Sequence, residues 1–163
     1  MNDVTFSGYI PGAIGRIVEL HATYYHKHWG FGLFFESKVA RDLSEFLGRR
    51  NEAQDGFWVA HIEGEMVGSI AIDGTHHGGK GAHLRWFIVA PERQGQGVGN
   101  RLLGEAITFC KDKEFCNVTL WTFAGLDAAR HLYEKDGFKL CEQREGNQWG
   151  KKVAEQRFDL TFR

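Results

Sequence analysis

The sequence predicts an α/β protein with a mixed central sheet of about seven strands and about four helices. Two observations support this fold class. After His83, runs with a strand pattern alternate with runs of helical periodicity, which implies crossover connections and parallel strand pairs. On either side of that region, strand-like runs follow one another as antiparallel hairpins do. The 163 residues, 42% hydrophobic and 25% charged, are typical of one globular domain over residues 1–163.

The first half of the chain predicts two helices between a short strand and a hairpin. Apolar residues recur at helical spacing from Ile14 to Tyr24 and again from Val39 to Leu47. Glu63-Gly64-Glu65 supplies the turn of the hairpin. The expected elements are a strand over 5–10, helices over about 13–29 and 36–47, and strands over 57–62 and 66–72.

The second half predicts the alternating part of the fold. Val98, Leu102 and Ala106 form the buried stripe of one helix, and Gly137 is a glycine signal that ends another. The expected elements are a strand over 82–89, a helix over about 97–113, a strand over 118–122, a helix over 126–135, and strands over 138–145 and 156–162.

A glycine-rich turn lies between the strand that starts near His83 and the helix that follows it. Gly95, Gly97 and Gly99 occupy alternate positions, where glycine lets the backbone adopt φ > 0 and approach a ligand closely. The helix start beyond them carries unpaired N–H groups and a partial positive charge. Strand, turn and helix start together predict a site for a phosphate or pyrophosphate.

Known nucleotide motifs do not match this turn. The dinucleotide fingerprint needs Gly-x-Gly-x-x-Gly and an acidic residue that closes the next strand, but that strand ends at Trp121-Thr122. The P-loop needs Gly-x-x-x-x-Gly-Lys-Ser/Thr, which residues 95–102 do not supply. The glycines alone leave open a flexible turn that binds no ligand.

Two longer motifs resemble the signatures of the GNAT superfamily of N-acetyltransferases. One segment of this chain resembles the superfamily's acyl-CoA-binding motif, namely Gln94-x-x-Gly97-x-Gly99, preceded by Val89-x-Pro91. Another segment, one strand later, resembles the superfamily's second signature, namely Ala129-x-x-Leu132-Tyr133-Glu134-Lys135-x-Gly137-Phe138. The closest resemblance is to the acetyltransferase domain found fused to MarR-type winged-helix regulators. It rests on the segments LRWFIVAPERQGQGVG, LWTFAGLDAARHLYEKDGF and YYHKHWGFG.

The resemblance extends over nearly the whole chain and implies the GNAT fold, in which helices cover both faces of the sheet and the fourth and fifth strands splay apart. It also implies acetyl-CoA as cosubstrate, with its pyrophosphate on the glycine turn and its pantetheine arm in the splay. The residues implied for this ligand are Ile88, Val89, Gln94, Gly95, Gln96, Gly97, Val98, Gly99, Asn100, Thr122 and Ala129. Related chains often have asparagine in place of Leu126, so that contact with the arm is absent here.

Acetyl transfer to an amine needs an oxyanion donor and proton transfers, and the resemblance suggests residues for each. A backbone N–H near Val89 is the candidate oxyanion donor. Tyr133 stands at the position of the superfamily's general acid, and a tyrosine with a pKa of about 10 is protonated at neutral pH. His83 stands where many members carry a glutamate base; Glu36 and bulk water are the alternatives.

The acceptor is an amine, either a small molecule or a protein amino group. The least generic segments are expected to wall its site, namely the aromatic run 24–35 and the loop with Trp149. The residues proposed for the acceptor are Trp29, Phe31, Glu36 and Trp149. The alternative is that these aromatic side chains only cover the sheet. Dimers are common in this superfamily, so a homodimer also stays open.

Composition excludes several other classes. A net charge of −1 without a basic patch or a winged-helix pattern argues against nucleic-acid binding. No run approaches the roughly 20 apolar residues of a membrane span, and the N-terminus does not read as a signal peptide. Cys110, Cys116 and Cys141 show no pairing pattern and indicate free thiols in a reducing compartment, so a cytoplasmic location is expected.

The histidines do not predict a metal site. His26 and His28 are two residues apart and point to different faces of a helix. His76-His77 lie in a connecting segment, with no carboxylate or third histidine at ligand spacing. A rival to the enzyme hypothesis remains: an acyl-CoA-binding sensor or interaction module with little catalysis, favoured by the kinship to a regulator-fused domain and by His83 and Leu126.

Overall fold

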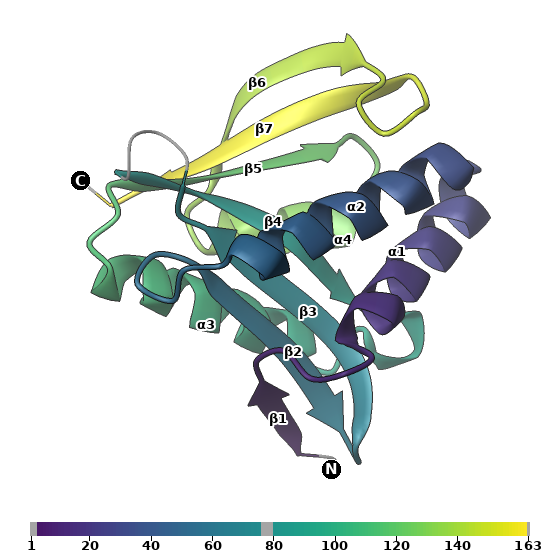
Figure 1. The fold of residues 1–163 in the computed structure, drawn as a ribbon. Coiled ribbons are helices and arrows are strands. Elements are labelled where there is room, and N and C mark those ends of the chain that lie inside the picture. Colours follow the sequence, from purple (N-terminus) through teal and green to yellow (C-terminus); the bar gives the residue numbers. More distant parts are fainter. Residues whose placement is uncertain (1–2, 76–79, 163) are drawn as a thin grey trace.

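Within residues 3–75 and 80–162, which the computed structural model describes, seven strands form one mixed sheet in the order β1-β2-β3-β4-β5-β7-β6 (Figure 1). The strands are β1 (Val4–Ser7), β2 (Gly56–Ile62), β3 (Glu65–Asp73), β4 (Gly81–Val89), β5 (Asn117–Phe123), β6 (Lys139–Gly146) and β7 (Val153–Thr161). The helices are α1 (Ala13–Trp29), α2 (Leu33–Arg49), α3 (Val98–Asp112) and α4 (Asp127–Lys135).

The sheet splays between β4 and β5. These two strands are parallel and pair over three residues, the last pair being His83 and Thr119. Beyond it, β4 continues along β3 as far as Val89, while β5 continues along β7 as far as Phe123. The two strands thus diverge toward their carboxyl ends. The expected mixed sheet with a splay between its fourth and fifth strands is confirmed.

Helices cover both faces of the sheet. Figure 1 shows α1 and α2 on one face and α3 and α4 on the other. The alternation of side chains along β2 explains this arrangement. Phe57 and Val59 belong to the apolar cluster that contains α1 and α2 residues, whereas Ala60 and Ile62 belong to the cluster that contains α3 residues. Cys110 of α3 is fully buried in the second cluster, where it packs as a small apolar side chain.

Several element ends differ from the expected ones. α2 begins at Leu33, three residues before the expected start. Phe35 extends the buried stripe by one turn before Val39, whereas Leu33 and Phe34 are 80% and 59% exposed and add nothing to it. β7 begins at Val153 rather than residue 156, and its first residues pair with the end of β6. β1 ends at Ser7, before the expected end at residue 10.

A β-bulge in β4 was not expected from the sequence. Ser69 pairs with Ile88 and Ala71 pairs with Arg85, so two steps along β3 correspond to three along β4. Trp86 lies inside this bulge with φ of 48°, and the Ser69 hydroxyl donates to its carbonyl at 2.7 Å. The bulge breaks the strict alternation of β4 beside the splay, which re-aims the residues that line it.

Candidate active site

Two pockets meet where β4 and β5 diverge. The first, called the glycine-turn pocket, has a volume of about 550 Å³ and is lined by the end of β4, the turn 94–97 and the starts of α3 and α4. The second, called the aromatic pocket, has a volume of about 300 Å³ and opens beside α1, α2 and the loop with Trp149. Tyr25, Phe87, Leu126 and Ala129 line both pockets, so the two form one continuous site.

The glycine turn has the backbone that the sequence predicts. Gly95 and Gly97 have φ of 79° and 85°, and Gly97 is the residue immediately before α3. A Cβ atom at either position would meet open space, so the turn leaves its main chain accessible. The side-chain amides of Gln94 and Gln96 donate to the carbonyls of Val89 and Glu92, which ties the turn to β4 and to the preceding 3₁₀ turn. The start of α3 therefore faces an open pocket with its N–H groups available.

The N–H of Val89 faces the splay. Gly68 of β3 lies opposite Val89, and the next bond of the ladder runs from Ala90 N to Val67 O at 2.7 Å. Val89 therefore occupies a non-hydrogen-bonded position, where N–H and C=O point away from β3. Its carbonyl accepts from Gln94 Nε2 on that side. The same side holds the glycine-turn pocket, which Val89 lines.

Tyr133 of α4 is buried and lines the aromatic pocket. The ring packs among Phe87, Phe138 and Phe158, with centroids 6.0, 5.8 and 6.1 Å away. Burial raises the pKa of the hydroxyl well above its ordinary value, and Tyr25 raises it further. Among the described residues, no hydrogen bond to this hydroxyl is formed. It is therefore a protonated donor that can serve a ligand.

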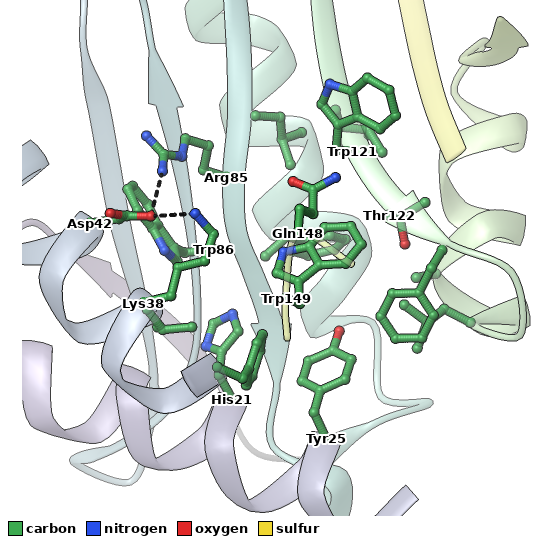
Figure 2. Close-up of a pocket in the computed structure, with 18 of the residues that line it drawn as sticks. His21, Tyr25, Lys38, Asp42, Arg85, Trp86, Trp121, Thr122, Gln148 and Trp149 are labelled. Atoms are coloured by element: carbon green, nitrogen blue, oxygen red, sulfur yellow. Dashed lines mark hydrogen bonds and ion pairs between the residues drawn. The ribbon is translucent and has the colours of Figure 1, made fainter. Parts of the chain in front are cut away.

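His21 of α1 presents a neutral imidazole to the aromatic pocket (Figure 2). Its Nδ1 lies 2.8 Å from the carbonyl oxygen of Ile17, and since a carbonyl only accepts, Nδ1 carries the hydrogen. Nε2 then carries a lone pair and has no hydrogen-bond partner among the described residues. Burial lowers the pKa of His21 to about 4, although the bond to Ile17 raises it. The ring is thus an acceptor at neutral pH.

A charged cluster lies on the side of the aromatic pocket formed by α2 and β4 (Figure 2). Lys38 Nζ lies 3.0 Å from Asp42 Oδ2, and a guanidinium nitrogen of Arg85 lies 3.7 Å from the same oxygen. The guanidinium also stacks on the ring of Trp86, 4.1 Å from the ring centroid. The bulge thus brings a cation and an aromatic ring from neighbouring positions of β4 to one pocket.

A family model for the acetyltransferase (GNAT) family matches residues 15–138, which is more than half of the chain. The chain belongs to the GNAT family. An N-acetyltransferase of Methanocaldococcus jannaschii, itself uncharacterised, is 29% identical over 125 residues, covering 73% of this chain and 54% of the relative. N-acetylaspartate synthetase of Xenopus tropicalis is 34% identical over 83 residues, covering 51% of this chain and 30% of the relative. The chain thus spans about half or less of the length of these relatives.

Solved structures of other proteins share the GNAT fold. The Salmonella typhimurium protein yncA, solved with its cofactor acetyl-CoA, matches with a TM-score of 0.77 and 16% identity, over 98% of this chain and 94% of that one. A ribosomal-protein-alanine N-acetyltransferase from Brucella melitensis matches with a TM-score of 0.78 and 18% identity, over 97% and 99%. At such identities the likeness concerns the fold.

Most of the residues expected for the cosubstrate lie at the glycine-turn pocket. Those that line it are Ile88, Val89, Gln94, Gly95, Gly97, Gly99, Asn100 and Ala129. Gln96 is exposed on the turn, and Val98 is buried beneath it. Thr122 instead lines the aromatic pocket.

The residues expected for catalysis and for the acceptor are spread more widely. Tyr133, His83 and Trp149 line the aromatic pocket, and His83 lies at the point where the splay begins. Three others line neither of the two pockets described: Phe31 is buried among aromatic rings, Trp29 packs against Phe123, and Glu36 is exposed in the first turn of α2.

Sequence reasoning singled out neither His21 nor Tyr25, although Tyr25 lies in the run 24–35 that was expected to wall the acceptor site, and it missed Arg85 and the Lys38–Asp42 pair. One signal was available for the first two, because Ile17, His21 and Tyr25 are spaced by four residues and share a helix face. A histidine in such a stripe is buried by its neighbours. Arg85 had no such signal, since the bulge that places it is a backbone feature.

No group of three or more His, Cys, Asp or Glu side chains that could hold a metal ion occurs among the described residues. His76 and His77 lie outside the described residues. His26 Nδ1 lies 2.8 Å from the carbonyl of Phe31. None of the helices in the described part of the chain is long and apolar enough to cross a membrane.

Proposed function

We propose that this GNAT domain is an acetyl-CoA-dependent N-acetyltransferase, which transfers the acetyl group to an amine by direct attack in a ternary complex. One observation carries the proposal: two pockets meet at the splay, and the protonated Tyr133 lines one of them and packs against Phe87, which lines both. The N-acetyltransferase relative and the acetyl-CoA found with the Salmonella protein support the choice of reaction and cosubstrate. We also propose the closer kinship to domains fused to MarR-type regulators, on the segments quoted above.

The residues of the glycine-turn pocket fit acetyl-CoA. The N–H groups at the start of α3 and the open space over Gly95 and Gly97 suit a pyrophosphate. The carbonyl of Val89, which faces the splay, suits an N–H of an extended amide-containing arm, which would bond to it as an added strand does. Leu126 adds an apolar wall. When bound there, acetyl-CoA would supply an activated acetyl thioester.

The reaction balances with groups that the site contains. The amine nitrogen bonds to the carbonyl carbon, the carbon–sulfur bond breaks, the nitrogen loses one proton and the sulfur gains one. The N–H of Val89 is the candidate donor to the developing oxyanion. Tyr133 would give its proton to the departing sulfur, since burial keeps the hydroxyl protonated.

The attacking amine must be oriented and must lose a proton. Nε2 of His21 offers a hydrogen-bond acceptor inside the aromatic pocket. Because burial lowers the pKa of His21 to about 4, it orients an N–H better than it removes a proton. His83, at the start of the splay, stays the candidate base, directly or through water.

A coupled assay tests the proposed function. The protein is mixed with acetyl-CoA and a panel of amines, release of free thiol is followed, and acceptors are identified by a mass gain of one acetyl group. Thiol release above the acceptor-free rate, with an acetylated amine, is expected. Tight acetyl-CoA binding without such release would overturn the enzyme and favour the acyl-CoA sensor.

A further inference from the structure

Among the residues that the structure describes, the charged side chains that line the aromatic pocket are two cations and one anion, Lys38, Arg85 and Asp42. All three lie on its α2–β4 side, whereas Trp121, Trp149 and Tyr25 are drawn on the other side in Figure 2. The pocket therefore combines an apolar wall with a cationic side. Its lining alone favours a ligand that carries negative charge at one end.

Arg85 donates a hydrogen bond to Asp73 and forms an ion pair with Asp42, but both contacts are long. The nearest carboxylates lie 3.5 Å away, at Asp73, and 3.7 Å away, at Asp42. Each of these carboxylates has a closer cation, since Arg49 lies 2.7 Å from Asp73 and Lys38 lies 3.0 Å from Asp42. The guanidinium of Arg85 thus has only long contacts, while its acidic neighbours are already neutralised.

The environment of Arg85 adds to this argument. Its side chain is 24% exposed and the bulge directs it along the pocket, where the ring of Trp86 supports the guanidinium plane. Burial lowers the pKa of Arg85 despite the opposing effects of Asp73 and Asp42, so the group has lost much of its hydration. Arginine nevertheless stays charged at neutral pH. A partly dehydrated, pre-oriented guanidinium is the group that binds a carboxylate through two parallel hydrogen bonds.

We propose that the acceptor is an amine of the amino-acid type, which carries a carboxylate and an apolar body, and that Arg85 binds this carboxylate with Lys38 beside it. The amine end of the ligand rests on the proposed acetyl transfer; the carboxylate site rests on the charged cluster alone. The aromatic residues opposite the cluster would cover the apolar body, and Nε2 of His21 would meet the amine.

Matched acceptor pairs test the proposal on the intact chain. Acetyl transfer is measured with phenylalanine against 2-phenylethylamine and with leucine against 3-methylbutylamine. The carboxylate-bearing member of each pair is expected to have the higher kcat/KM, by roughly tenfold or more. Arg85→Met should remove this preference. Arg85→Lys keeps the charge but lacks the planar guanidinium that makes two parallel hydrogen bonds, so it should keep part of the preference.

Arg41→Met is the matched control, since Arg41 also approaches Asp42, at 3.8 Å, but is 66% exposed and does not line the pocket. It should leave the preference intact. Equal kcat/KM values within each pair, or equal loss for both members in Arg85→Met, would overturn the carboxylate site. Thermal unfolding of each variant shows whether it is folded.

Binding of 3-phenylpropanoate, which has no amine, separates this proposal from the acetyltransferase assignment. Its binding to the protein with CoA is followed through tryptophan fluorescence, because Trp86, Trp121 and Trp149 line the pocket. Binding to the wild type that weakens roughly tenfold or more in Arg85→Met supports the carboxylate site even if no amine is acetylated. Absence of binding, or equal binding to both proteins, overturns it even if carboxylate-free amines are acetylated.

Discussion

The buried carboxylate of Glu155 accepts hydrogen bonds from the backbone N–H and the side-chain amide of Gln148, at 2.9 and 3.0 Å. Glu155 lies on β7 and is 1% exposed, and Arg144 of β6 also donates to it at 3.1 Å. Its carboxylate therefore fixes the loop between β6 and β7. The next residue of that loop, Trp149, lines the aromatic pocket.

Glu155→Gln should loosen this loop. The amide cannot replace the charge-assisted acceptor, so we expect a loss of about 1–3 kcal/mol in the free energy of unfolding. KM for the amine acceptor should rise several-fold while the Kd for acetyl-CoA stays unchanged, because the glycine-turn pocket lies elsewhere. Chemical denaturation and steady-state kinetics check both. Glu145→Gln is the control, because Glu145 is 69% exposed in its ion pair with Lys152; it should change neither the free energy of unfolding nor KM for the amine. A weaker affinity for acetyl-CoA in Glu155→Gln would contradict the proposed role of Glu155.

The pH dependence of stability should reveal the protonation of His21 on unfolding. Its pKa is lowered from 6.5 to about 4 in the folded protein, so below pH 6.5 the unfolded chain binds a proton that the native chain does not. The free energy of unfolding should therefore fall as the pH drops from 6.5 to 4, by about 3 kcal/mol in total. His21→Gln should flatten this fall, whereas the exposed His131→Gln should retain it. Urea unfolding at a series of pH values measures the slope.

Glu155 should affect the pH dependence of stability at lower pH than His21 does. Burial raises its pKa, but the hydrogen bonds from Gln148 and Arg144 outweigh that effect and leave the pKa below its ordinary value. A carboxyl group with a lowered folded pKa stabilises the protein above the unfolded pKa, and that stabilisation is lost as pH falls through the folded pKa. The difference in stability between wild type and Glu155→Gln should thus be full above about pH 5 and shrink below about pH 4. A difference that does not change with pH would argue against an ionised Glu155.

Tyr133→Phe should lower kcat with little effect on the Kd for acetyl-CoA. The variant keeps the ring packed against Phe87, Phe138 and Phe158 and removes only the proton donor. General-acid catalysis contributes roughly 10²–10⁴ in rate, so the loss should be about 100-fold or more. Tyr9→Phe, at a side chain that is 52% exposed, is the control. An unchanged kcat would remove Tyr133 from the mechanism.

The pH profile of kcat adds a second test of Tyr133. Because burial raises the pKa of its hydroxyl above the ordinary value of about 10, the acid should stay protonated across the neutral and moderately alkaline range. No alkaline fall in kcat from this group is expected below about pH 10. A fall with an apparent pKa between 8 and 9 that disappears in Tyr133→Phe would refute this ionisation state.

Local patterns in the sequence were sufficient for the strands and helices, because apolar spacing reports directly which face an element buries. The glycine turn was equally readable, since Gly95 and Gly97 do adopt the positive φ that their spacing suggested. The position of β7 between β5 and β6 was not readable, because strand order depends on contacts distant in the sequence.

The acceptor side of the site was less predictable for a physical reason. His21 and Lys38 come from different helices and Arg85 from β4, and only the packing of α1 and α2 on the sheet brings them to one pocket. Arg85 depends further on the bulge at Trp86, whose positive φ at a non-glycine residue has no local signal. Phe31, in contrast, looked like a ligand wall by composition but is used to fill the core.

Gly97 provides a final test, because a substitution there strains the backbone without causing a steric clash. Its φ is 85°, and a Cβ atom there would meet nothing within 4 Å. Substitution should therefore cost only backbone strain, about 1–2 kcal/mol for Gly97→Ala and less for Gly97→Asn, since asparagine tolerates the left-handed region better. Strain at this position should also displace the first N–H groups of α3, so the Kd for acetyl-CoA should rise in the order Gly, Asn, Ala.

Gly104→Ala is the matched control for that series. Gly104 is exposed inside α3 and its added Cβ would also meet open space, so alanine should stabilise the helix by up to about 1 kcal/mol without affecting acetyl-CoA binding. Thermal unfolding and calorimetric titration with acetyl-CoA measure both effects. Equal affinity for acetyl-CoA in Gly97→Ala and the wild type would mean that the conformation of the turn does not form the phosphate site, and the ligand would have to be held by the splayed strands alone.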